Sequence, residues 1–240
     1  MVKQNTTIIY ENTVAGTFVR RMNRFTAEVL IDGAPQIVHV KNTGRLQELL
    51  MSEAKVTLQK TLNPNRKTAY DLISVYKPKL KWVNIDSLAP NALMKQQLMS
   101  LNYELVKPEY TYGESRIDFY MERFLTEVKG CTLADDLHLG IGLFPDAPTE
   151  RGVKHLHELT KAAKEGYHCS IAFVIQMNGI HRVMPNEAAQ PEFKEALVKA
   201  AKEGVQIVCY SCHVEADSIK ITGVVEDTSR FVEAQRRKSE

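Results

Sequence analysis

The stretch RIDFYMERFLTEVKG, residues 116–130, constrains the fold more than any other part of the sequence. From Arg116 to Met121 apolar residues alternate with polar or aromatic ones, and the alternation resumes after Glu122-Arg123. A period of two residues is typical of a half-buried β-strand. The pattern therefore predicts a tight β-hairpin that turns at residues 122 and 123.

Charged residues on this hairpin are expected to face one another. A turn at residues 122 and 123 sets Asp118 opposite Glu127 and Arg116 opposite Lys129. Like charges at directly opposed positions, roughly 5 Å apart at Cβ, are destabilising. A divalent cation offsets such repulsion, because hard cations take carboxylate oxygens as ligands.

The hairpin therefore predicts a catalytic metal site. Asp118 and Glu127 are expected to hold Mg²⁺ or Mn²⁺, and Lys129 to orient a water or stabilise the charge that develops on a phosphoryl group. Two other interpretations stay open. One is a surface hairpin with solvated charges, and the other is a structural ladder of salt bridges in an assembly factor for other proteins.

Charge is unevenly distributed along the 240 residues, although the net charge is only +2. Residues 1–83 hold 13 Lys and Arg against 6 Asp and Glu, whereas residues 84–240 hold 18 against 23. A basic first third joined to an acidic remainder indicates that the first part holds a polyanion and the second a metal.

Targeting signals are missing from the expected places. No apolar run approaches the roughly 18 residues of a membrane span, and the N-terminus lacks the basic-then-apolar order of a signal peptide. The cysteines are sparse, which favours free thiols in a reducing compartment; they are Cys131, Cys169, Cys209 and Cys212. We expect a cytoplasmic protein with no membrane partner.

The fold class is predicted to be mixed α/β, in two domains. Residues 1–83 contain five short β-rich segments, at 17–20, 26–31, 35–40, 55–61 and 69–75, and a short helical patch at 46–51. This order fits a small closed barrel of the OB type. After a connector at 77–83, residues 84–240 alternate strands with helices expected at 90–101, 149–165 and 191–203, which predicts a mixed sheet covered by helices. A long loop is expected at 131–148, and the terminal EAQRRKSE is expected to fray.

Three further groups of residues are candidates for binding. A nucleic-acid-binding face is predicted on the barrel, with a solvated basic rim as the alternative; its residues are Arg20, Arg21, Arg24, Arg45, Arg66 and Lys67. A polar wall beside the metal site is predicted from one face of the second helix, with a solvated face as the alternative; its residues are Arg151, Lys154, His155 and Glu158. Cys209-x-x-Cys212 resembles half of a zinc site, but no second pair completes it.

Several motifs together resemble the sugar fermentation stimulation protein A family. They run in order through nearly the whole chain: VKNTGRLQELL, TLNPNRKTAYDLISV, WVNIDSLAPNALM, YGESRIDFYM, FLTEVKGCTL and FPDAPTERGVKHLHEL. The resemblance implies an OB-like domain followed by a domain similar to the PD-(D/E)XK nucleases. It also implies binding of DNA, with RNA as the alternative, with little sequence preference, and a link to the regulation of sugar use.

The same resemblance assigns the site residue by residue. Asp118 and Glu127 match the metal carboxylates of the nuclease fold, and Lys129 matches its catalytic lysine. One position departs from the family pattern: the first helix often carries a supporting Glu where this sequence has Gln96. A neutral amide holds a cation less strongly than a carboxylate, so Glu109 and Glu114 are the candidate substitutes.

Overall fold

The first third of the chain folds into a closed barrel. In the computed structural model, which describes residues 6–101, 103, 105–135 and 140–236, its strands are β2 (Thr13–Arg21), β3 (Thr26–Ile31), β4 (Ala34–Val40), β5 (Lys55–Lys60) and β6 (Tyr70–Lys77). Strand β4 pairs with both β3 and β6, which closes the barrel. Every second residue of β3 is buried, so Ala27 and Val29 point into the barrel together with Phe18 and Leu58. The predicted OB-like barrel is confirmed.

Two details of this domain differ from expectation. The segment expected to be a connector contains β7 (Lys81–Asn84), which pairs with β6. The expected helical patch at 46–51 is instead a pair of turns, in which Leu46 has a left-handed φ of 49°. A residue in that conformation cannot continue a right-handed helix.

The rest of the chain is built on a mixed sheet of seven strands. In spatial order they are β1 (Thr7–Ile9), β16 (Ser218–Glu226), β15 (Gln206–Val214), β13 (His168–Ile175), β10 (Phe124–Cys131), β9 (Ser115–Met121) and β8 (Lys107–Tyr112). The central pairs β10–β13 and β13–β15 are parallel, and the outer pairs are antiparallel. The first strand of the chain thus lies in the larger sheet and not in the barrel.

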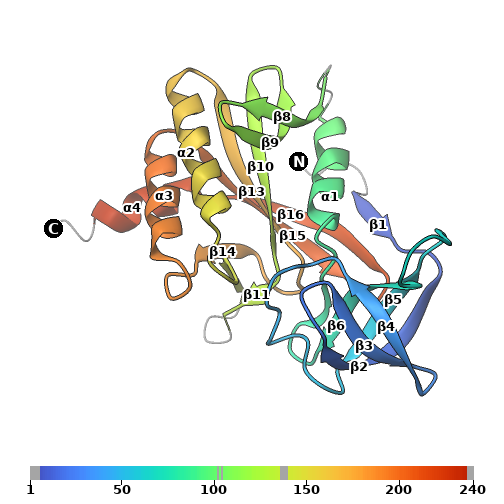
Figure 1. Cartoon of the computed structure of the whole chain (residues 1–240). Coiled ribbons are helices and arrows are strands. Elements are labelled where there is room, and N and C mark those ends of the chain that lie inside the picture. The colour runs from blue at the N-terminus through green and yellow to red at the C-terminus, as the bar shows by residue number, and fades with distance from the viewer. Residues whose placement is uncertain (1–5, 102, 104, 136–139, 237–240) are drawn as a thin grey trace.

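Helices cover both faces of this sheet. They are α1 (Ala89–Met99), α2 (Glu150–Lys164), α3 (Pro191–Lys202) and α4 (Thr228–Arg236). In Figure 1, α2 and α3 lie side by side on one side of the sheet and α1 lies on the other. Leu156 and Leu159 of α2 pack with Leu125 on one face, whereas Leu93 of α1 packs with Val128 on the other. Leu125 and Val128 are an odd number of positions apart on β10, so their side chains point to opposite faces of the sheet, because side chains alternate along a strand.

The expected loop at 131–148 contains two short strands. These are β11 (Leu133–Ala134) and β12 (Ile141–Phe144), which form a small sheet with β14 (Arg182–Pro185). The charged C-terminal stretch continues as α4 to Arg236, and residues 237–240 lie outside the described part of the chain.

A buried polar network joins the barrel to the larger domain. Lys41 Nζ, from the end of β4, donates to Asp86 Oδ2 at 2.8 Å, and Asp86 Oδ1 accepts from the backbone N–H of Leu88 at the start of α1. Gln176 Nε2 donates to Asn84 Oδ1 and to the Asp86 carbonyl. The network orients the start of α1, which reaches the candidate site described below.

The structure bears on two further features, membrane-spanning helices and the state of the cysteines. Within the described residues, no helix is long and apolar enough to cross a membrane. The four cysteines are buried free thiols. Cys209 and Cys212 belong to different apolar clusters on the two faces of β15, so they do not form a common site, and burial raises their pKa to about 11 and about 12.

Candidate metal site and interdomain cleft

The predicted hairpin register is confirmed for the part nearest the turn. Strands β9 and β10 pair Met121 with Phe124, Tyr120 with Leu125 and Phe119 with Thr126. Glu122 and Arg123 form the turn, and both have positive φ, 42° and 75°. Two successive left-handed residues are the geometry of a type I′ hairpin turn.

The ladder between the two strands ends one position before the carboxylates. Asp118 and Glu127 are therefore not paired as backbone neighbours, and the expected pair of Arg116 with Lys129 is wrong. Arg116 pairs instead with Thr111 of β8, and Lys129 pairs with Phe173 of β13. The physical reason is that β9 and β10 separate beyond the pair of Phe119 with Thr126, on the side away from the turn, while β10 stays paired with β13.

Asp118 occupies the point at which the two strands separate. Its Oδ2 accepts from the backbone N–H of Val128 at 2.7 Å, and its Oδ1 accepts from the side-chain amide of Asn91 at 2.8 Å. Burial and the charge of Glu127 raise the pKa of Asp118, against the lowering effect of these hydrogen bonds. The carboxylates thus repel each other as expected, although they are not in one ladder.

Glu127 is almost completely enclosed, with 2 % of its surface exposed. Its Oε1 accepts from Lys129 Nζ at 2.6 Å and from Nδ1 of His155 on α2. Burial alone raises the pKa of Glu127, but the hydrogen bond from His155 and the charge of Lys129 bring it below its usual value. Its second oxygen, Oε2, is buried and has no hydrogen-bond partner.

The open edge of β10 supplies a third oxygen beside the carboxylates. The N–H and C=O of one strand residue point to the same edge. Because the N–H of Val128 points to Asp118, the carbonyl of Val128 faces the same gap. Asp118 and Glu127 offer carboxylate oxygens, the type of ligand that suits Mg²⁺, Mn²⁺ or Ca²⁺.

The fit to a metal rests on few protein ligands. In the described part of the chain, no group of three or more His, Cys, Asp or Glu side chains is arranged to hold a metal. Mg²⁺ is commonly bound through one or two carboxylates and keeps several waters. An unpartnered buried oxygen on Glu127 is costly without a cation, because a buried polar atom loses its water and gains nothing in return. The residues therefore fit a divalent cation that keeps part of its water shell.

The first helix contributes a different residue from the one expected. Gln96, at the position where the family often has Glu, accepts a hydrogen bond from the backbone N–H of Thr7 at 3.2 Å and faces β1. Asn91, five residues earlier, holds Asp118. On an α-helix, five residues correspond to a rotation of about 140°, so both cannot reach the same site. The expectation that Gln96 occupies the supporting position is wrong.

The proposed substitutes for a supporting carboxylate lie elsewhere. Glu109 pairs with Arg116 at 3.0 Å, and Glu114 pairs with Lys154 at 3.5 Å; the side chains of both glutamates are exposed. In contrast, Arg151 and His155 do lie beside the site. Arg151 Nε donates to His155 Nε2 at 3.3 Å, so the hydrogen on the other ring nitrogen is the one donated to Glu127.

The six basic residues of the barrel have different surroundings. Arg21 donates to backbone carbonyls of Asn23, Arg24, Asn42, Gly44 and Arg45. Arg66 forms two hydrogen bonds with Asp71, and Arg20 pairs with Glu28 at 2.7 Å. Arg24, Arg45 and Lys67 are exposed, and the guanidinium of Arg24 lies 5.6 Å from the ring centre of Phe25.

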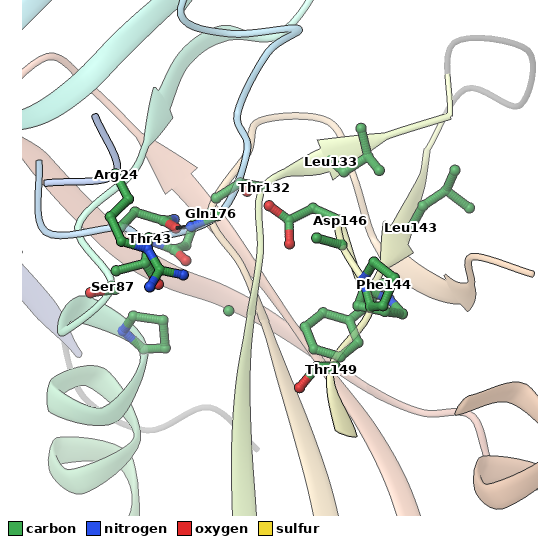
Figure 2. A pocket seen from close by; sticks show the side chains of 17 residues that line it. Arg24, Thr43, Ser87, Thr132, Leu133, Leu143, Phe144, Asp146, Thr149 and Gln176 are labelled. Atoms are coloured by element: carbon green, nitrogen blue, oxygen red, sulfur yellow. Dashed lines mark hydrogen bonds between the residues drawn. The ribbon is translucent and has the colours of Figure 1, made fainter. Parts of the chain in front are cut away.

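A cleft of about 410 Å³ lies between the barrel and the larger domain, and it reaches the strand β10 that carries Glu127. Figure 2 shows Arg24, Thr43 and Ser87 on one side of it and Phe144 on the other, with Asp146 and Thr132 between them. Gly130, the residue after Lys129 in β10, lines the cleft. The sequence did not identify this cleft, because its walls come from segments that are far apart in the chain.

The fold and site define a class of protein with an N-terminal OB barrel joined to a mixed-sheet domain. The family described as "SfsA N-terminal OB domain" matches residues 19–85, and the one described as "Sugar fermentation stimulation protein RE domain" matches residues 85–218. The chain belongs to the sugar fermentation stimulation protein family.

Relatives with that name align over almost their whole length. The sugar fermentation stimulation protein homolog of Ruminiclostridium cellulolyticum is 45% identical over 225 residues, which cover 90% of this chain and 98% of the relative. The homolog of Clostridium acetobutylicum is 43% identical, covering 89% and 96%. A solved structure of Pyrococcus furiosus SfsA in complex with Ca²⁺ has the same fold, with a TM-score of 0.79, 24% identity, and coverage of 91% of this chain and 96% of that one.

Proposed function

We propose that this protein binds nucleic acid with little sequence preference and hydrolyses its phosphodiester bonds with Mg²⁺ or Mn²⁺. The observation that carries the proposal is the buried, unpartnered Oε2 of Glu127, together with Asp118, whose pKa is raised by burial and by the charge of Glu127. Lys129 and His155 satisfy only Oε1 of Glu127, and a cation would satisfy Oε2 and offset the repulsion between the two carboxylates. The Ca²⁺ in the complex of the Pyrococcus furiosus relative supports a hard cation in this fold.

Each residue has a distinct part in the proposed reaction. A divalent cation bound here would supply Lewis acidity. Asp118 and Glu127 would hold the cation, and Lys129, whose Nζ is already fixed by Glu127, would donate a hydrogen bond to a phosphate oxygen as negative charge develops there. Water adds across the P–O bond, which leaves a phosphate monoester and an alcohol.

His155 and Lys129 keep Glu127 charged and oriented. His155 and Lys129 both contact Oε1, which directs Oε2 away from them. Partners of this kind fix the direction of metal-binding carboxylates. Arg151 adds one more hydrogen bond to this series, because its Nε donates to Nε2 of His155 and so fixes the ring.

A second candidate function is binding without cleavage, as a regulator that keeps a silent site. The excess of positive charge in residues 1–83 favours it, and the name shared by the relatives connects it with the stimulation of sugar fermentation. Binding that depends on phosphate contacts weakens steeply as salt is raised.

Cleavage separates the two functions. Plasmid, single-stranded DNA and RNA are incubated with the protein and Mn²⁺, in parallel with an Asp118→Ala control. We expect products with at least one nucleic acid that the control does not form. The absence of cleavage above the control on all three, with retained DNA binding at low salt, would favour the regulator.

A further inference from the structure

We propose that the cleft between the barrel and the larger domain holds one unpaired nucleotide of a DNA strand, with its base against Phe144 and its phosphate beside Arg24. This inference rests on the proposed function and adds the form of the substrate: a strand with an unstacked base rather than an intact duplex. It is carried by the size, the wall chemistry and the position of the cleft.

The cleft has the size of a single nucleotide site. Pockets for small molecules and cofactors typically span about 300–1,000 Å³, and this one measures about 410 Å³. A duplex is too wide to enter a cavity of this volume, because its major groove, which is only part of its width, already measures about 12 Å across. Bases of a duplex are also stacked inside it, so a base reaches such a cleft only when it is unpaired or extruded.

One wall is aromatic and held rigidly. Phe144 lies 5.5 Å from Phe173 and 5.1 Å from Phe193, measured between ring centres. These core contacts hold the ring in place at the edge of the cleft, next to Pro145. Stacking on aromatic side chains is the usual way in which proteins bind unpaired bases without reading their sequence.

Two hydrogen-bond acceptors line the cleft, Gln176 beside the Arg24 wall and Asp146 between the walls. Gln176 is 1 % exposed, and its Nε2 is held by Asn84 and Asp86, which turns its Oε1 toward Gly130. A Cβ at position 130 would lie 2.4 Å from that oxygen, so glycine is needed there. The second acceptor is the carboxylate of Asp146. Both suit the N–H groups of a nucleobase and neither suits a phosphate.

The opposite wall suits the phosphate. Arg24 is exposed at the tip of the β2–β3 hairpin and reaches the cleft next to Thr43. Asp146 approaches the barrel loop at Gly44, where an added Cβ would lie 2.3 Å from its Oδ2. Of the residues that line the cleft in the described part of the chain, Arg24 carries the positive charge that attracts a phosphate.

The position of the cleft suits a strand that continues to the metal site. Gly130 is three residues beyond Glu127 in β10, which corresponds to about 10 Å at the rise of a β-strand. That length is about three steps of a stacked nucleic-acid strand, at about 3.4 Å each. A nucleotide in the cleft therefore holds the strand a few nucleotides from the bond at the metal.

Fluorescence anisotropy tests the proposal without relying on metal or cleavage. Three probes of equal length are titrated in EDTA with the full chain carrying Asp118→Asn: a labelled 12-nucleotide DNA strand, the same strand with abasic sites throughout, and the 12-base-pair duplex. We expect the single strand to bind about tenfold more tightly than the abasic strand, because base stacking contributes on that scale. It should also bind more tightly than the duplex.

Matched substitutions locate the contact. Phe144→Leu should abolish the difference between the normal and abasic strands, and Arg24→Gln should weaken binding of both. Lys55→Gln removes one positive charge from an exposed position of the barrel that does not line the cleft; it should leave all affinities unchanged. Equal binding of normal and abasic strands by the unsubstituted cleft would overturn the proposal, and so would equal losses from Arg24→Gln and Lys55→Gln.

The outcome is separable from that of the proposed function. A base-dependent affinity in EDTA together with no cleavage in Mn²⁺ would retain the cleft as a strand-binding site and reject hydrolysis. Cleavage without any base-dependent affinity would retain hydrolysis and reject the cleft as a site for an unpaired base.

Discussion

Asn91 of the first helix donates its side-chain amide to Oδ1 of Asp118 at 2.8 Å. This contact ties a metal-site carboxylate to α1, whose start is in turn held by Asp86 and, through Lys41, by the barrel. The orientation of Asp118 thus depends on how the two domains are joined. The five predictions below test the contacts that hold the site and the domains.

Removing the charge of Glu127 should abolish metal binding. Glu127→Gln keeps the shape of the side chain but replaces a carboxylate oxygen by an amide, which a hard cation binds less strongly. Calorimetric titration with Mn²⁺ should show site-specific heat for the wild type and none for the variant. Glu109→Gln, an exposed residue paired with Arg116, is the control; equal heats for all three proteins would contradict the site.

His155 should act on the metal through Glu127. His155→Phe retains the buried ring but removes the hydrogen bond to Oε1, so the carboxylate is less firmly oriented. Loss of such a partner typically lowers metal affinity about 10- to 100-fold. Mn²⁺ titration measures this, and His157→Phe, an exposed position on the same helix, should bind Mn²⁺ as the wild type does.

The two polar residues of α1 should have opposite importance. Asn91→Ala removes the hydrogen bond to Asp118 and should weaken Mn²⁺ binding, within about the same 10- to 100-fold range. Gln96→Glu restores the residue that the family often has, yet should leave the affinity unchanged because position 96 faces Thr7. A gain in Mn²⁺ affinity or cleavage from Gln96→Glu would show that α1 is rotated about its axis in solution, with position 96 facing Asp118.

Arg21 should matter for stability rather than for DNA contact. Its guanidinium holds the carbonyls of the β2–β3 turn and of the loop at 42–45 together, and burial lowers its pKa. Arg21→Ala should lower the free energy of unfolding in urea by about 2–3 kcal/mol, the scale of hydrogen bonds to a charged group. Arg20→Ala removes an exposed ion pair and should cost less than about 1 kcal/mol.

Asp71 should make stability depend on acid. It is buried between Arg66, Lys41 and His39. Burial opposes its charge, but the hydrogen bonds from Arg66 and the charge of Lys41 bring its pKa below the usual value. A lowered folded-state pKa stabilises the protein above the unfolded value, about 3.9, and this contribution disappears as pH falls through the folded value.

The measurement compares wild type with Asp71→Asn in urea at several pH values. The difference in unfolding free energy should be constant from neutral pH to about pH 5 and should shrink below about pH 4. A difference that stayed constant in acid would mean that Asp71 is not the charged partner of Arg66.

Local pattern was sufficient to predict the barrel, the mixed sheet and the hairpin. The alternation on either side of Glu122-Arg123 predicts both strands and their turn, because side chains of a strand alternate between two faces. Three pairs of the register follow from that turn. The crowding of Asp118 and Glu127, and the neighbouring Lys129, were equally readable from the spacing of charges.

Contacts between distant segments were not readable in this way. Nothing in a single sequence tells which side of α1 faces β9, so Gln96 was expected where Asn91 lies. Arg21 looked like a DNA ligand because three of its five carbonyl acceptors, those of Asn42, Gly44 and Arg45, belong to a loop some twenty residues away. Long-range packing determines such pairs, since helix rotation and loop closure depend on the whole core.

Asp118, Glu127 and Lys129, to which the proposed chemistry is assigned, all belong to one hairpin, where charge repulsion and strand period are local properties. Packing of α2 against β10 added His155 to Glu127 and left one oxygen free. Packing of the barrel against the larger domain made the cleft. Those features depend on segments meeting in space, and no local pattern in the chain contains that information.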